Sequence, residues 1–237
     1  MTDERTADLA ANLAGVEQRI ARACEVAGRP RADVTLIVVT KTWPSADVRR
    51  LASLGVGDVG ENRDQDAAAK AHDCADLDLR WHFVGQLQTN KCRSVAQYAT
   101  VVHSVDRPAL VDALAGAARR AGRVVTALVQ VDLDPSSGTG APGRGGVRPA
   151  EAVDLAGLIA GSEGLDLGGV MAIAPVDDDP VVAFGRLAEV VSMVRTAHPG
   201  ARIVSAGMSG DLEAAVAAGA THVRVGTAVL GTRPPLG

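Results

Sequence analysis

The sequence predicts one α/β domain over residues 1–237, a (β/α)8 TIM-type barrel preceded by an extra N-terminal helix. Eight short apolar stretches rich in β-branched residues recur along the chain, and amphipathic segments of helical period lie between most of them. Such alternation is typical of a parallel sheet, and 237 residues match one closed barrel. An open doubly wound sheet is the alternative, but no Gly-x-Gly-x-x-Gly motif follows the first strand.

The first 28 residues predict a helix that stands outside the repeat. Apolar residues recur at intervals of three and four between Leu9 and Ile20, which places them on one helical face. Gly28-Arg29-Pro30 ends the segment, because both glycine and proline disfavour a helix interior. We expect the apolar face to pack on the barrel rather than on a partner, in a monomeric protein.

The repeat then proceeds strand by strand. We predict strands at 34–40, 57–60, 80–84, 101–103, 124–131, 165–173, 203–204 and 222–225. We predict helices near 45–54, 64–75, 89–98, 107–121 and 212–218. Residues 135–149, rich in Gly, Pro and Ser, predict a mobile loop after the fifth strand, on the face of the barrel built from the loops that follow the strands.

Composition excludes several classes of partner. The net charge is −4 and aromatic residues make up only 2% of the chain, which disfavours a nucleic-acid partner. Cys24, Cys74 and Cys92 are an odd number without metal-ligand spacing, so we expect reduced thiols and no metal site. No secretory leader pattern and no membrane-length apolar run occurs. We therefore expect a cytoplasmic protein without a membrane partner.

Lysine is scarce, and one lysine occupies an unusual position. Three of the 24 basic residues are lysines, and Lys41 directly follows the first apolar strand. A primary amine can lose its proton when desolvated and attack a carbonyl group, whereas a guanidinium stays protonated. The position predicts a reactive amine; a lysine that extends from the strand end into solvent is the alternative.

Other polar groups follow the remaining strands and should meet Lys41 at one mouth of a parallel barrel. They are Glu61, Asn62, His82, Gly85, His103, Ser104, Asp132, Met171, Ser209, Arg224, Gly226 and Thr227. His82 and His103 could act beyond the residues that touch a ligand, although a histidine at a strand end is more often structural.

Two of the predicted loops suit an anion. Ser209 lies in Gly207-Met-Ser-Gly-Asp211 and is expected to be the N-cap of the helix that follows strand seven, while Gly226 and Thr227 follow strand eight. These are the loops where barrels commonly hold phosphate. Helix capping and a tight turn are the alternatives. A phosphate pocket opposite an amine suggests pyridoxal phosphate, whose pyridine nitrogen Arg224 would keep unprotonated by repulsion.

Longer segments carry a resemblance to a known family. They are Val39-Thr-Lys-Thr42, Gly60-Glu-Asn62, Trp81-His-Phe-Val-Gly-Gln-Leu-Gln-Thr-Asn-Lys91, His103-Ser-Val-Asp106, Gly169-Val-Met-Ala-Ile173, Gly207-Met-Ser-Gly-Asp211 and Val223-Arg-Val-Gly-Thr227. With these segments the chain resembles, over nearly its whole length, the pyridoxal phosphate homeostasis proteins, single-domain relatives of the alanine racemase barrel.

The resemblance implies a fold-type III barrel that holds pyridoxal 5'-phosphate as a Schiff base on Lys41. It places Ser209, Gly226 and Thr227 at the phosphate, Arg224 at the pyridine nitrogen, and Asn62 near the ring; Met171, from the strand-end set, is a further expected contact. The implied function is to carry or buffer the cofactor in vitamin B6 and amino-acid homeostasis, with pyridoxal-phosphate-dependent enzymes as clients and no established reaction.

Three positions depart from the family pattern. Trp43 stands where a second lysine is frequent, Arg63 replaces an aromatic residue, and Arg144 replaces a lysine. None of these positions is an expected contact of the aldehyde or the phosphate, although a hand-off that needs the second lysine would be affected.

Two enzyme functions remain as alternatives. A racemase-like enzyme needs two bases, and the single tyrosine, Tyr98, falls late in a predicted helix, away from the mouth. His82 or His103 would have to replace it. A Schiff-base barrel enzyme acting on a phosphorylated substrate fits Lys41 and the phosphate loops equally well, but the longer segments favour the carrier.

Overall fold

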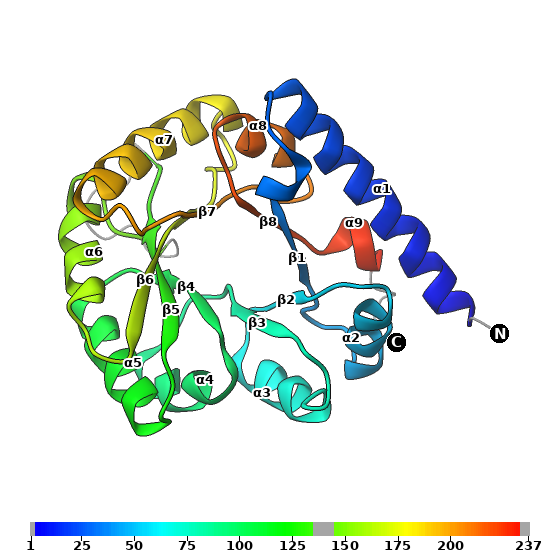
Figure 1. The fold of residues 1–237 in the computed structure, drawn as a ribbon, viewed down its shortest axis with the longest axis horizontal. Helices are drawn as coiled ribbons and strands as arrows, with labels where there is room; N and C mark the ends of the chain where they lie inside the picture. Colours follow the sequence, from blue (N-terminus) through cyan, green and yellow to red (C-terminus); the bar gives the residue numbers. More distant parts are fainter. Residues whose placement is uncertain (1–2, 135–144, 233–237) are drawn as a thin grey trace.

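The computed structural model describes residues 3–134 and 145–232 and confirms the predicted barrel. Within these residues eight parallel strands close in sequence order, each paired with the next and the last with the first (Figure 1). The strands are β1 (Thr35–Val39), β2 (Asp58–Glu61), β3 (Arg80–Phe83), β4 (Val101–Val105), β5 (Val125–Val131), β6 (Leu165–Ala172), β7 (Ile203–Ser205) and β8 (His222–Val225). Each predicted strand is present, with its ends shifted by at most two residues.

Helices form a ring around the strands (Figure 1). They are α1 (Glu4–Val26), α2 (Ser45–Ser53), α3 (Asp64–Asp73), α4 (Cys92–Tyr98), α5 (Pro108–Arg120), α6 (Ala152–Ala160), α7 (Pro180–Ala197), α8 (Leu212–Ala217) and α9 (Thr227–Leu230), with 3-10 turns η1 (Arg31–Asp33), η2 (Thr89–Lys91) and η3 (Pro149–Glu151). The short α9 carries no periodic pattern of its own, so the sequence did not reveal it. No helix in the described ranges has both the length and the apolar character needed to cross a bilayer.

The extra helix α1 packs on the barrel, as the sequence predicted. Its apolar face is buried at Leu9, Val16 and Ile20. Figure 1 shows α1 lying alongside α8 and α9, and the Asn12 side chain donates a hydrogen bond of 3.0 Å to the carbonyl of Val229 in α9. The packing covers the part of the ring where β8 meets β1.

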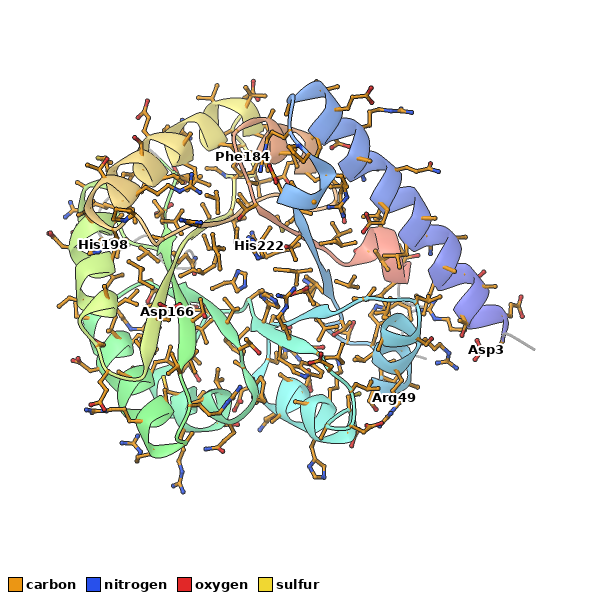
Figure 2. The ribbon with its side chains drawn as sticks, viewed as in Figure 1. Asp3, Arg49, Asp166, Phe184, His198 and His222 are labelled. Carbon is orange, nitrogen blue, oxygen red and sulfur yellow. The ribbon has the colours of Figure 1, made fainter. Side chains whose placement is uncertain are left out.

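The interior of the barrel contains both apolar and polar side chains. Val101, Leu128 and Met171 form a small apolar cluster within the ring. Polar side chains project into the same interior from β2, β3, β4, β7 and β8, and Figure 2 shows His222 inside the ring of strands. Side chains alternate between the two faces of a strand, so the residues next to these inward groups contact the helices instead.

The predicted mobile loop lies mostly outside the described residues, which resume at Gly145. Val147 pairs with Val131 at the end of β5, and the amide of Asp132 donates 2.9 Å to the Val147 carbonyl. η3 follows directly. The end of this connection is therefore anchored to the carboxyl end of β5, close to the mouth of the barrel.

Candidate functional site: a pocket at the carboxyl ends of the strands

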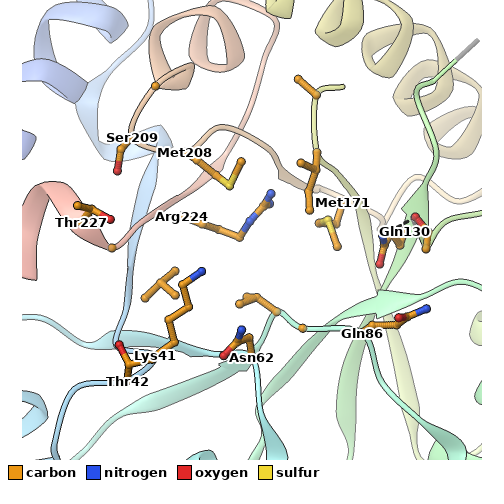
Figure 3. Close-up of a pocket in the computed structure, with 18 of the residues that line it drawn as sticks. Lys41, Thr42, Asn62, Gln86, Gln130, Met171, Met208, Ser209, Arg224 and Thr227 are labelled. Carbon is orange, nitrogen blue, oxygen red and sulfur yellow. Dashed lines mark hydrogen bonds between the residues drawn. The ribbon is translucent and has the colours of Figure 1, made fainter. Parts of the chain in front are cut away.

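A pocket of about 800 Å³ opens at the carboxyl ends of the strands. All seven residues predicted to contact a ligand line it, and Figure 3 shows the Lys41 side chain directed toward Arg224. They are Lys41, Asn62, Met171, Ser209, Arg224, Gly226 and Thr227. Asp132 and Gly85 of the strand-end set also line the pocket, as predicted. Side chains that the sequence reasoning did not single out include Gln86, Gln130, Val176 and Met208.

The backbone that carries Lys41 is held from two directions. The carbonyl of Thr40 accepts from the Trp43 amide at 3.1 Å and from Lys70 Nζ at 2.8 Å. Thr42 adopts a φ of 69°, a left-handed conformation that a β-branched residue reaches only at a cost of about 1–3 kcal/mol. The tight turn at the end of β1 thereby presents the Lys41 side chain to the pocket.

Glu61 does not face the pocket, so its prediction as a mouth residue is wrong. It is buried beneath α3, where its Oε1 lies 2.5 Å from Lys70 Nζ and accepts from the Thr40 hydroxyl at 2.6 Å. The reason is strand alternation: Gly60 takes the inner face, so Glu61 takes the outer one. Lys70 on α3 is the residue the sequence reasoning missed here, and its place within the helix gave no indication of burial.

Arg224 is a buried cation at the centre of the pocket floor. It is 5% exposed, and its Nη1 donates to Ser205 Oγ at 2.6 Å while its Nη2 donates to the Ala172 carbonyl at 3.0 Å. Burial lowers its pKa to about 10, against an opposing contribution from Asp211. No carboxylate in the described residues lies within ion-pair distance of it. A guanidinium has five N–H groups, so donors remain that can serve a ligand.

Ser209 and the start of α9 form one side of the pocket. The N-cap of α8 is Asp211, whose carboxylate accepts from the Met208 amide at 2.6 Å, so the prediction of Ser209 as the N-cap is wrong. Ser209 instead lines the pocket, on the same side as Thr227 at the first position of α9. The first amides of a helix have no partner inside the helix.

Gly226 permits the close approach of this wall to β1. A Cβ atom at Gly226 would lie 3.1 Å from the Val39 carbonyl oxygen, tighter than ordinary contact. The backbone of β8 can therefore turn into α9 directly above the end of β1, next to Lys41. This turn brings the hydroxyl and amide donors of the wall into the same pocket as the Lys41 amine.

His82 and His103 lie below the pocket, inside the barrel, rather than at its mouth. His103 Nδ1 is 2.9 Å from Ser205 Oγ, the acceptor of Arg224, and His103 Nε2 is 2.9 Å from His82 Nδ1. Complete burial lowers the pKa of His103 well below its ordinary value, and the neighbouring His82, Arg224 and His222 act in the same direction. Ser104 points to the opposite face of β4 and is buried without a hydrogen-bond partner in the described part of the chain.

The three departures from the family pattern lie in different surroundings. Trp43 lines the pocket, and the guanidinium of Arg5 lies 4.5 Å from its ring centroid, a cation–π contact that secures the indole. Arg63 is exposed at the start of α3. Arg144 lies outside the described residues.

Comparison with known proteins agrees with this geometry. Residues 11–234 match the family model described as the alanine racemase N-terminal domain. The pyridoxal phosphate homeostasis protein of Mycobacterium tuberculosis is 42% identical over 249 residues, which cover 97% of this chain and 95% of the relative. The protein of the same name from Escherichia coli K12 is 33% identical, with 95% and 97% covered.

Solved structures share the overall fold. PipY of Synechococcus elongatus PCC7942, solved with pyridoxal phosphate bound, superposes with a TM-score of 0.81 at 32% identity and covers 94% of this chain and 100% of that one. An alanine racemase of Streptomyces coelicolor has a TM-score of 0.74 at 20% identity, with 97% of this chain but 59% of that one covered, which shows the shared fold alone. By sequence over nearly its whole length, the chain belongs to the pyridoxal phosphate homeostasis protein family.

Proposed function

We propose that this protein binds pyridoxal 5'-phosphate in the pocket and carries or buffers the cofactor, contributing to vitamin B6 and amino-acid homeostasis. The observation that carries the proposal is the arrangement of Lys41 and Arg224 in one pocket, with Ser209, Gly226 and Thr227 on a shared wall. The names of the relatives and the bound cofactor in PipY support it.

The chemistry of the lining residues fits this cofactor. A phosphate group accepts hydrogen bonds, and the Ser209 hydroxyl and the first amides of α9 are donors. A pyridine nitrogen is also an acceptor, and Arg224 is a donor-only group that remains charged near neutral pH. A cation beside the pyridine nitrogen disfavours its protonation, which weakens the ring as an electron sink and favours holding the cofactor over transforming a substrate.

Lys41 is the proposed attachment point for the aldehyde of the cofactor, through a Schiff base. Of the chain's three lysines it is the one that lines the pocket, since Lys70 is paired with Glu61 beneath α3 and Lys91 lies in η2. When bound, the cofactor supplies an aldehyde that reacts reversibly with an amine. Asn62 and Met171 are proposed to contact the ring from opposite sides of the pocket.

Among the described residues, neither the tyrosine nor a histidine lies at the pocket to serve as the second base of the racemase-like alternative. Tyr98 is the single tyrosine of the sequence, and its hydroxyl lies 3.4 Å from Asp64 between α3 and α4, outside the pocket. Burial raises its pKa, which further disfavours its role as a base. His82 and His103 are separated from the pocket by Ser205 and Arg224. Carriage of the cofactor therefore remains the better-supported function.

The cellular setting belongs to the same proposal. A monomeric carrier in the cytoplasm would exchange its cofactor with pyridoxal-phosphate-dependent enzymes as clients. The buried, unpaired thiols of Cys24, Cys74 and Cys92 are compatible with a reducing compartment, and the apolar face of α1 is already used on the barrel. Transfer from the loaded protein to an apo-enzyme client, followed by the client's activity, tests the hand-off directly.

The deciding experiment is reduction of the loaded protein with borohydride, followed by peptide mass mapping. We expect an absorption band of the bound cofactor in the unmodified protein and an adduct at Lys41. Lys41→Ala should lose both the band and the adduct, while Lys91→Ala serves as the matched control and should retain them. An adduct distributed over Lys70 and Lys91, or no adduct, would contradict the proposal and favour a barrel that binds another phosphorylated ligand.

A further inference from the structure

A continuous chain of hydrogen bonds crosses the interior of the barrel and ends at Arg224. Asp58 Oδ1 lies 2.8 Å from His82 Nε2, and His82 Nδ1 lies 2.9 Å from His103 Nε2. His103 Nδ1 lies 2.9 Å from Ser205 Oγ, which accepts from Arg224 Nη1 at 2.6 Å. Five strands contribute one residue each, and every member is at most 6% exposed.

The chain links the two ends of the barrel. Asp58 is the first residue of β2, where the Arg80 side chain, largely exposed, also binds it at 2.6 Å. Arg224 belongs to the pocket at the carboxyl ends of the strands. A residue far from the pocket is thus joined to the cation of the pocket floor without an intervening gap.

The two terminal groups fix the direction of the hydrogen bonds at the two ends of the chain. Arg224 has donors only, so Ser205 Oγ must accept from it. Burial acts to raise the pKa of Asp58, but hydrogen bonds from His82 and Arg80 outweigh it and hold that pKa below its ordinary value. The ionised carboxylate only accepts, so His82 Nε2 must carry a proton.

The middle of the chain then has one arrangement when both histidines are neutral. His82 Nδ1 lacks a proton and accepts from the Nε2–H group of His103. His103 Nδ1 in turn accepts from the hydroxyl of Ser205. Each of the four hydrogen bonds uses one proton, and no donor or acceptor along the chain is left without a partner.

One extra proton disrupts this order. If either histidine carried protons on both nitrogens, His103 Nδ1 would have to donate to Ser205 Oγ, which already accepts from Arg224. The serine hydroxyl proton would then need another acceptor at a fully buried position, beside a cation. The fully satisfied neutral chain is therefore the stable form of the interior.

We propose that Asp58, His82, His103 and Ser205 act as a positioning relay that holds the Arg224 guanidinium in place with its remaining N–H groups directed to the pocket. The relay belongs to the ligand-free protein and rests on the proposed function only for the identity of the ligand that Arg224 serves. The four members of the relay are positioning residues, because of the five residues in the hydrogen-bond chain only Arg224 lines the pocket.

The first test measures the protonation of the histidine ring nitrogens in the ligand-free protein by nitrogen-15 NMR. We expect His82 and His103 both to be protonated on Nε2 alone, and a nitrogen–nitrogen coupling across the hydrogen bond from His103 Nε2 to His82 Nδ1. Either histidine protonated on Nδ1, or absence of that coupling, would overturn the relay whether or not the protein binds pyridoxal phosphate.

The second test measures whether the far end of the relay affects the pocket. Asp58→Asn removes the charged acceptor, and Asp76→Asn is the control, because Asp76 pairs with Arg49 at 2.6 Å outside the relay and lies away from the pocket. We expect Asp58→Asn to weaken pyridoxal phosphate binding about threefold and to shift the absorption of the bound cofactor, since a hydrogen-bond chain transmits polarisation. Asp76→Asn should leave the affinity and the absorption of the bound cofactor unchanged.

Ser205→Ala tests the end of the relay that contacts Arg224. It removes the acceptor of Arg224 and the donor of His103 together, so we expect about tenfold weaker binding, as for loss of a hydrogen bond to a charged group. Affinities and spectra of Ser205→Ala and Asp58→Asn that equal those of Asp76→Asn would overturn the positioning role. If the unmodified protein does not bind pyridoxal phosphate, the proposed function is contradicted. The nitrogen-15 measurement then still tests the relay.

Discussion

At the scale of single residues, two lysines near the same carbonyl group have opposite surroundings. Lys41 extends into the pocket and is exposed, whereas Lys70 is buried in an ion pair with Glu61 and donates to the Thr40 carbonyl directly before Lys41. The second oxygen of Glu61 is buried without a partner among the described residues. The Lys70 amine therefore stabilises the turn that carries Lys41, and it is already hydrogen-bonded to Thr40 and Glu61.

Removing the Lys70 side chain should destabilise the folded protein. Lys70→Ala leaves the Glu61 carboxylate buried and unpaired, for which we expect a loss of about 3–5 kcal/mol in the free energy of unfolding. The double variant Lys70→Met with Glu61→Gln removes both charges and should recover much of that loss. Urea denaturation of the variants measures this; equal stabilities for Lys70→Ala and the double variant would show that the unpaired charge is not the cause.

At the scale of the elements, glycines let neighbouring strands approach one another closely. A Cβ atom at Gly85, just after β3, would lie 2.1 Å from the backbone oxygen of Asn62, just after β2. At Gly169 in β6, where φ is 148°, a Cβ atom would lie 2.0 Å from the Ile203 oxygen of β7. The spacing of these strands depends on the missing side chains, and at Gly85 the position of Asn62 depends on it too.

Gly85→Ala tests this close approach. The added methyl group cannot fit without moving backbone, so we expect a loss of about 1–3 kcal/mol in the free energy of unfolding, together with weaker pyridoxal phosphate binding because Asn62 is displaced. Gly57→Ala is the matched control, since a Cβ atom at Gly57 would meet nothing within 4 Å. Thermal melts and cofactor titrations compare the two; an alanine tolerated equally at both positions would contradict the steric argument.

At the scale of the whole molecule, the buried histidines make stability depend on pH. Burial, the largest cause, lowers the pKa of His222 from 6.5 to about 4, and nearby His82 acts in the same direction. Burial likewise lowers the pKa of His103. The unfolded chain binds protons at these histidines at a higher pH than the folded protein, so stability is complete above about pH 6.5 and falls as the pH decreases toward 4.

The expected loss can be measured by chemical denaturation at pH 8 and pH 5. From the shift of His222 alone we expect the free energy of unfolding to decrease by about 2 kcal/mol between these values. His222→Gln, which cannot be protonated in the unfolded chain, should reduce the decrease by a similar amount. A stability that does not change between pH 8 and pH 5 would show that these histidines are protonated to the same extent in both states.

The sequence by itself determined the barrel, the location of Lys41 and the two loops that form the proposed phosphate wall. Those features are local: apolar runs mark strands, and residues directly after a parallel strand come to one edge of the sheet. Only the closed barrel shows that Glu61, His82, His103 and Ser104 do not reach the pocket. Side chains alternate along each strand, and the register and tilt of the closed barrel direct His82 and His103 into the interior and Glu61 outward to Lys70. The relay from Asp58 to Arg224 joins five strands distant in sequence, so it exists only once the barrel has closed.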